Sequence, residues 1–103
     1  MSGGKYILVN YGVNVASGDE WEIIFETENK KEILEKYTKE LNSILNLTND
    51  NEIYEITNVP KWVAENVKEV NYNNEKEIEI VTGIYIIYDE EGNGSIIAVL
   101  LVK

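Results

Sequence analysis

Carboxylates are the side chains that give this sequence most of its chemical potential. The chain of 103 residues carries 19 Asp and Glu against nine Lys, with no Arg, His or Cys, for a formal net charge of -10. Without His or Cys, imidazole bases, Ser–His or Cys–His nucleophiles, thiolate zinc sites and disulfides are excluded. Without Arg there is no bidentate fork for phosphate. The chemistry that remains is acid–base catalysis or cation binding by carboxylates, with Lys and Tyr as the only helpers.

The loop that begins at Asp89 has the closest spacing of oxygen ligands. Asp89, Glu91 and Asn93 alternate ahead of Gly94, as ligands do in the first half of a calcium-binding loop. The twelfth position of such a loop carries a bidentate Glu, but here it is Leu100. Because the flanking residues have strand composition, a solvated hairpin turn is favoured over a calcium site.

Two other carboxylate arrangements have no recognisable motif. Asp19, Glu20 and Glu22 can in principle bind a cation, and a glycosidase-like pair is chemically possible. A chain of this size without a Gly-rich phosphate loop offers little room for a deep cleft. We therefore expect neither enzymatic activity nor a cofactor.

A row of alternating carboxylates lies where the last predicted hairpin begins. Glu75, Glu77 and Glu79 are two residues apart, with Ile78 and Ile80 on the opposite face, so on a strand they would form a stripe with a spacing of about 6.7 Å. A solvated strand face explains such a stripe. A sharper hypothesis joins it to the acids of the first hairpin, so that both present one negative field to a basic partner. Those acids are Asp19, Glu20, Glu22, Glu26 and Glu28.

Nine of the aromatic residues are Tyr or Trp, and most lie in patterns that core packing explains. Trp62 and Tyr72 flank the least regular region, which makes them candidates for anchoring a partner. The same segment is a candidate for holding a small ligand against the sheet, although an anionic ligand would find no Arg there.

Hydrophobic periodicity predicts five strands and two helices. In chain order they are a hairpin of Lys5–Tyr11 and Trp21–Thr27, a helix from about Lys30 to Asn46, a short strand in Glu52–Asn58, a short helix in Lys61–Val70, and a hairpin of Glu77–Tyr88 and Ser95–Val102. The residues between the short helix and the last hairpin, Asn71–Asn74, have loop composition.

The predicted main helix has a clear start and a balanced surface. Asn29 is placed as its N-cap, and Glu32 follows at the capping-box position. Glu–Lys pairs four residues apart, such as Glu32–Lys36, predict that most of its lysines have local partners. The excess negative charge should then lie outside this helix.

These elements predict an α+β fold in a single domain spanning 1–103, with residues 1–4 flexible. The main helix packs on one face of an antiparallel sheet of four to five strands, in the order β-β-α-β-(short α)-β-β. Ile96–Val102 is apolar without alternation, so either both of its faces are covered within the chain or one meets a partner. No signal sequence or membrane span is evident, which predicts a soluble, cytoplasmic protein without membrane contact.

The charge balance directs the functional hypotheses. A net charge of -10 disfavours direct contact with nucleic acid and suits a protein partner with a basic surface. In size and charge alone, the chain resembles the small acidic inhibitors of phages and mobile elements, anti-CRISPR and other anti-defence proteins among them, and toxin-neutralising immunity proteins. That resemblance implies a non-enzymatic inhibitor that blocks a nucleic-acid-binding groove. The alternatives are a homo-oligomeric structural protein, assembled through Ile96–Val102 or an open sheet edge, and a domain that sequesters a small ligand.

Overall fold

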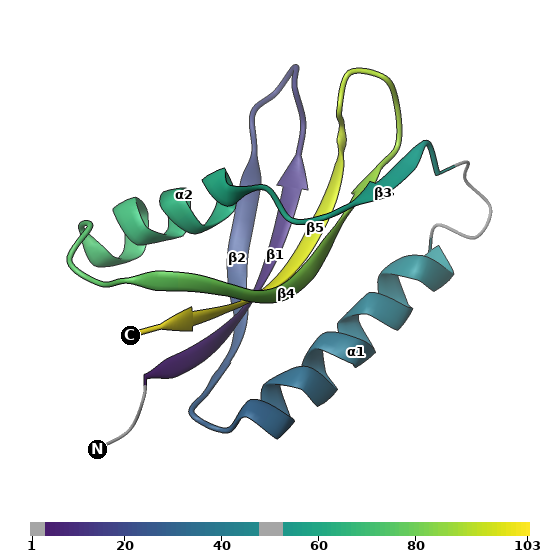
Figure 1. Ribbon diagram of the computed structural model, residues 1–103. Coiled ribbons are helices and arrows are strands. Elements are labelled where there is room, and N and C mark those ends of the chain that lie inside the picture. Colours follow the sequence, from purple (N-terminus) through teal and green to yellow (C-terminus); the bar gives the residue numbers. More distant parts are fainter. Residues whose placement is uncertain (1–3, 48–52) are drawn as a thin grey trace.

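The computed structural model describes residues 4–47 and 53–103, which form one small α+β domain (Figure 1). The elements are β1 (Lys5–Val13), β2 (Glu20–Thr27), α1 (Lys30–Leu47), β3 (Glu55–Thr57), α2 (Lys61–Tyr72), β4 (Ile78–Ile87) and β5 (Gly94–Val102). This confirms the predicted order of elements. Residues 1–3, which we expected to be flexible with Gly4, and Glu52, the predicted start of the third strand, lie outside the described residues.

The five strands form one antiparallel sheet in the order β2-β1-β5-β4-β3. The first and last hairpins are joined by the pairing of β1 with β5, in which Lys5 lies opposite Val102 and Gly12 lies opposite Ser95. The strand that is last in sequence is therefore central in the sheet. The two edges of the sheet are β2 and the three-residue β3.

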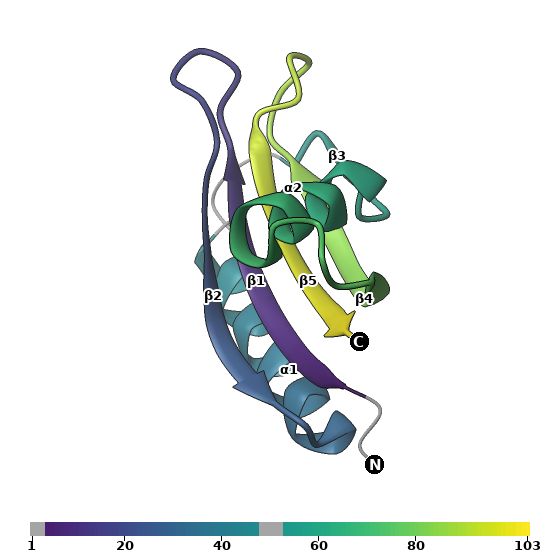
Figure 2. The same ribbon diagram turned by 90° about the vertical axis from the view of Figure 1, so that its left-hand side faces the viewer.

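The two helices cover opposite faces of the sheet, as Figure 2 shows. On one face, Val63 and Val67 of α2 pack against Ile96, Ala98 and Leu100 of β5. On the other face, Ile33 of α1 packs against Ile97 and Val99 of the same strand. This arrangement explains the continuous apolar run of β5, because consecutive side chains point to opposite faces and both faces are covered within the chain.

The central position of β5 corrects one form of the homo-oligomer hypothesis. The oligomer hypothesis offered Ile96–Val102 as a contact surface, but every residue from Ile96 to Leu100 has no exposed area and the strand has a neighbour on each side. A second copy therefore has no access to it in the folded domain.

The start of α1 is as predicted, but its predicted ion pairs are not formed. The Glu32 N–H donates to Asn29 Oδ1 at 3.0 Å, which confirms the N-cap. In the described part of the chain, the salt bridges are Lys5–Glu26 and Lys103–Glu79, and neither involves α1. Lys36 lies instead over the Phe25 ring, with Nζ 4.9 Å from its centroid.

The second helix is longer than predicted. It includes Tyr72, and ends at Asn73, whose φ of 51° is left-handed. Val70, where the predicted helix ended, is 65% exposed. Tyr72 contacts the core in the last turn, in place of Val70.

Candidate functional site

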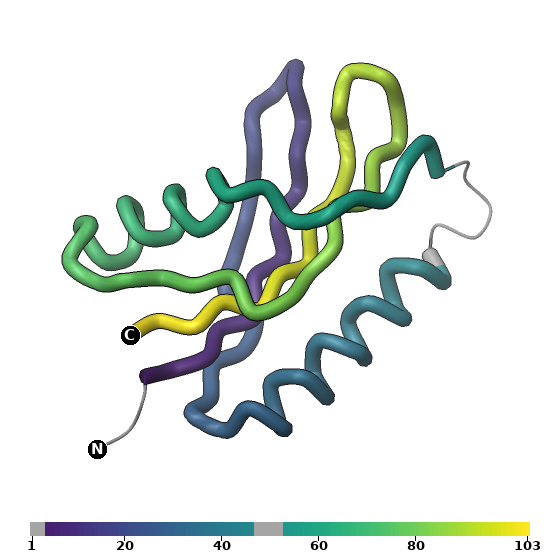
Figure 3. The backbone as a smooth tube through the Cα atoms, in the orientation of Figure 1, coloured from purple at the N-terminus to yellow at the C-terminus, as the bar shows by residue number. Residues whose placement is uncertain are grey.

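The two β-hairpin loops lie side by side at one end of the sheet, which we call the hairpin end (residues 13–22 and 88–95; Figures 1 and 3). They are brought together because Val13 of β1 lies opposite Gly94 of β5, next to both turns. The Val15 N–H donates to Asn93 Oδ1 at 2.7 Å, which links one loop to the other. Segments 78 residues apart in sequence therefore form one surface.

The hairpin end is the most one-sided concentration of charge in the described chain. It has six carboxylates and no lysine; the acidic residues are Asp19, Glu20, Glu22, Asp89, Glu90 and Glu91. Five of the six are exposed, and Asp89 is half-buried. In the described part of the chain, Glu20 and Glu22 make no ion pair and no side-chain hydrogen bond. Their charge is therefore available to a partner.

Asp89 organises its own loop and is not free for a cation. Its Oδ1 accepts from the N–H groups of Glu91 and Asn93, both at 3.1 Å, and its Oδ2 accepts from the Asn93 side-chain amide at 2.8 Å. The bond from the Asn93 side chain is the main reason why the pKa of Asp89 is lowered. Because Asn93 Oδ1 is in turn used by Val15, two of the three predicted calcium ligands are engaged in loop contacts.

No other metal arrangement was found among residues 4–47 and 53–103, where no group of three or more His, Cys, Asp or Glu side chains is placed to hold a metal ion. Asp19, Glu20 and Glu22, the other predicted candidates, are among these residues and form no such group.

Two shallow hollows meet at Gly12. One, of about 370 Å³, lies between the two loops and is lined by Asn14, Ser17, Glu20, Tyr88 and Asn93 among others. The other, of about 410 Å³, is lined by Asn10, Trp21 and Glu22 and shares Gly12 and Glu20 with the first. Gly12 leaves space there because it lacks a side chain. A Cβ atom at this position would lie 3.5 Å from the Glu20 carbonyl oxygen, an ordinary contact.

The carboxylates of this end affect the pKa values of two buried tyrosines. Burial raises the pKa of Tyr11 and of Tyr85, and Asp19 raises both further by electrostatic repulsion of a phenolate. Asp89 also raises the pKa of Tyr85, so carboxylates of both loops act on the same group. The Tyr85 hydroxyl donates to the Gly92 carbonyl oxygen, which holds the second loop against the sheet.

The predicted partner anchors, Trp62 and Tyr72, are half-buried and pack against the core. Trp62 meets the edge of Tyr11 with ring centroids 5.3 Å apart, and Tyr11 stacks on Trp21 at 6.0 Å. The space proposed for a ligand between the sheet and this segment is filled by Val63 and Val67, which have no exposed area. Among described residues, the exposed large apolar side chains are Val15, Ile53, Tyr54, Ile56, Val70 and Tyr88.

The predicted stripe lies at the other end of the sheet. Glu79 pairs with Leu101 in the sheet, whereas Glu20 lies in the row of Gly12 and Ser95. Six residues along β5 correspond to about 20 Å, so the stripe and the first hairpin do not form one continuous patch. Glu75 and Glu77 are exposed before β4, and Glu79 pairs with Lys103 at 3.2 Å. Glu26 also faces this end and pairs with Lys5 at 3.3 Å, while Glu28 is exposed after β2.

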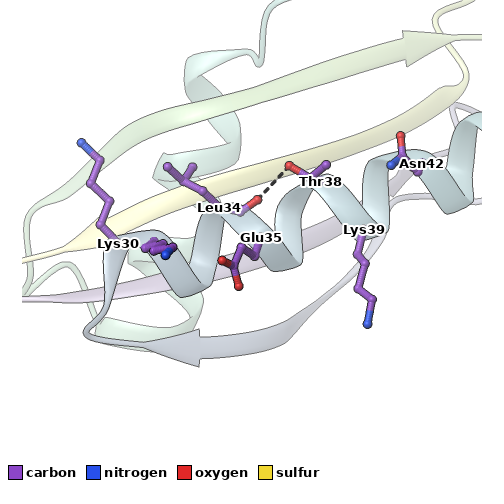
Figure 4. A pocket seen from close by; sticks show the side chains of 7 residues that line it. Lys30, Leu34, Glu35, Thr38, Lys39 and Asn42 are labelled. Atoms are coloured by element: carbon purple, nitrogen blue, oxygen red, sulfur yellow. Dashed lines mark hydrogen bonds between the residues drawn. The ribbon is translucent and has the colours of Figure 1, made fainter.

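Another hollow, of about 800 Å³, lies on α1 and is lined by that helix alone (Figure 4). Leu34 is half-buried and packs against the core on the α1 face, while Glu35 and Lys39 are exposed. A surface contributed by one helix does not enclose a small ligand.

Sequence reasoning missed the contribution of Glu90 and the joining of Asp89–Glu91 to Asp19–Glu22. The shared feature that could have indicated it is that both acidic segments lie at hairpin turns without lysine.

Comparison of the chain with family models, with curated proteins and with solved structures found no match. Within the described residues, neither helix has the length and apolar character required to cross a membrane.

Proposed function

We propose that this protein is a non-enzymatic, cytoplasmic binding module whose hairpin end attaches to a basic surface of a partner protein and blocks it. The observation that carries the proposal is the six carboxylates on two linked loops with no lysine between them. A surface of one sign of charge raises the rate of encounter with a surface of the opposite sign. The partner surface with the matching chemistry is one that binds nucleic acid, because it is built to contact phosphates.

Hydrogen bonds within and between the two loops support binding of a partner surface of one defined shape. Asp89 fixes its loop through three hydrogen bonds, and Asn93 fixes the position of that loop against the other. Carboxylates held on a fixed surface lose less conformational entropy on binding than carboxylates on a flexible chain. Inhibitors that phages and mobile elements direct against host defence, including anti-CRISPR proteins, and immunity proteins are the classes that this module resembles in size and charge.

The test is affinity capture from a bacterial lysate followed by competition with duplex DNA. We expect a basic, nucleic-acid-binding protein that is retained at low salt, weakened at about 0.5 M salt, where the screening length is only a few ångströms, and displaced by DNA. A bound protein that DNA does not displace would contradict the blocking role.

A matched pair of variants separates the hairpin end from net charge. The first carries Glu20→Gln, Glu22→Gln, Glu90→Gln and Glu91→Gln. The control carries Glu28→Gln, Glu65→Gln, Glu69→Gln and Glu75→Gln, which are exposed residues away from this end, so both have the same net charge. We expect the first to lose at least about tenfold in affinity and the control to change by less than about threefold. Equal losses would show that overall charge alone drives binding.

A further inference from the structure

One long edge of the sheet is open beside the hairpin end. Strand β2 has eight residues and forms one edge of the sheet, with β1 as its only neighbour among the described strands. In an antiparallel strand, every second residue directs its N–H and C=O away from the paired neighbour. In the described part of the chain, no backbone hydrogen bond from another segment reaches this edge. The opposite edge is different, because β3 has only three residues.

The two faces of β2 differ in chemistry. Glu22 lies opposite Asn10, whose side-chain amide donates to Glu40 of α1 at 3.4 Å, so Glu22 and Glu20 lie on the α1 face. Trp21 and Ile23 lie on the α2 face, where they pack against the core but remain half-buried. The first half of this edge therefore offers carboxylates on one face and partly exposed apolar groups on the other.

A second copy of the chain does not fit this edge. Antiparallel pairing of two β2 strands would bring the glutamates of one copy close to those of the other, and like charges in neighbouring strands are destabilising. Sheet edges are often protected from self-association by lysine, but here the protecting charges are all acidic. Because Glu20 and Glu22 make no ion pair among the described residues, the first half of this edge disfavours its own copy and remains open to a basic strand.

We propose that an extended segment of the partner adds to the free edge of β2 as a sixth strand, with alternating basic and apolar side chains. Its Lys or Arg side chains lie on the α1 face beside Glu20 and Glu22, over the hollow at Gly12. Its apolar side chains lie on the α2 face and extend the cover over Trp21 and Ile23. Backbone hydrogen bonds supply affinity, and the alternation of side chains supplies specificity. This inference rests on the proposed function, because it names the form in which a basic partner meets the acidic end.

The experiment compares two peptides of identical composition. One alternates Lys and Val over about eight residues, and the other places all Lys before all Val. Because only the alternating peptide separates its charges onto one face of a strand, we expect it to bind at least about tenfold more tightly at low salt. Amide hydrogen exchange followed by NMR should slow at alternate residues of β2 and nowhere else in the sheet. Glu20→Gln with Glu22→Gln should weaken the alternating peptide, and Glu65→Gln with Glu69→Gln on α2 is the matched control.

N-methylated peptides test the backbone contact without altering the protein. Methylation at alternate residues blocks one edge of the peptide, so two isomers block opposite edges while charge and side chains stay the same. We expect one isomer to lose at least about tenfold in affinity and the other to retain it, since each lost backbone hydrogen bond costs about 1 kcal/mol.

The results separate this inference from the proposed function. Equal binding of the alternating and the block peptide, equal effects of the two N-methylated isomers, no binding of either peptide, or slowed exchange outside β2 would each overturn strand addition. Capture of a basic protein that depends on the hairpin-end carboxylates would still support the proposed function in each of these cases. Loss of that dependence would overturn the proposed function itself.

Discussion

The two ends of the sheet carry similar side chains in opposite electrostatic situations. At the hairpin end, six carboxylates gather from two loops with no lysine. At the other end, where β1 begins and β5 finishes, Lys5 pairs with Glu26 and Lys103 pairs with Glu79. Both ion pairs of the described chain lie at the second end, so negative charge is partly neutralised there and left uncompensated at the first.

The comparison shows that the position of the negative charge says more about where a partner binds than the net charge does. A net charge of -10 spread evenly would make a protein soluble without selecting a partner surface. An uneven distribution gives the molecule a preferred side for approach to a basic surface.

The largest expected change in the free energy of unfolding comes from glycines at the hairpin end, where a substitution alters the packing without altering the charge. In Gly94→Ala, the added Cβ would overlap the Ile86 carbonyl oxygen in the neighbouring strand, so we expect a loss of about 3 kcal/mol in the free energy of unfolding. Gly12→Ala lies at the same end, but its Cβ has room, and we expect a change within about 1 kcal/mol. Urea unfolding of both variants provides the measurement. Similar losses for the two glycines would show that the hollow at Gly12 is not open.

A smaller effect of opposite sign should distinguish the carboxylates of the two ends. Glu20→Gln with Glu22→Gln removes like charges, and we expect it to raise the free energy of unfolding by about 0.5 kcal/mol at low salt. Glu26→Gln with Glu79→Gln changes the net charge equally but removes two exposed ion pairs, so a loss of up to about 1 kcal/mol is expected. Both differences should shrink in 1 M salt. A change in the free energy of unfolding with the same sign for both double variants would contradict the electrostatic difference between the two ends.

Acid titration should reveal the hydrogen bonds of Asp89. Its pKa is lowered in the folded state, so its contribution to stability is full above the ordinary aspartate pKa of about 3.9 and is lost as the pH falls through the lower folded value. In Asp89→Asn, we expect the loss of thermal stability between about pH 5 and pH 2 to be shallower than in the wild type. Circular dichroism melts across this range provide the measurement, and an unchanged slope would show that the loop does not hold the carboxylate.

The smallest expected effect appears in alkali. The pKa of Tyr85 is raised in the folded state, so its contribution is full below the ordinary tyrosine pKa of about 10 and is lost as the pH rises toward the folded value. Tyr85→Phe should reduce the fall in melting temperature above about pH 10. Any remaining effect of Asp19→Asn in the Tyr85→Phe background reports Tyr11, whose pKa Asp19 also raises. In the wild-type background, Asp19→Asn should lower the Tyr85 pKa measured by its ultraviolet absorbance.

The sequence predicted the elements well, because their signals are local. The apolar alternation of Trp21 and Ile23 indicated a strand, although a bulge turns Phe25 to the opposite face, and Asn29 indicated the start of the helix that follows. Prediction failed where a local sequence pattern is compatible with more than one set of side-chain contacts. Glu–Lys spacing in α1 permits ion pairs but does not form them, because exposed pairs gain little energy and each side chain loses freedom.

By itself the sequence determined the charge, the absence of imidazole, thiol and guanidinium chemistry, and the two hairpins with a helix between them. Only the tertiary structure decided which acidic segments share a surface. The pairing of β1 with β5 joins Asp19–Glu22 to Asp89–Glu91 and leaves Glu77 and Glu79 at the far end. The physical reason is that strand pairing depends on the combined burial of side chains on both faces of the sheet, which no local segment of the chain specifies.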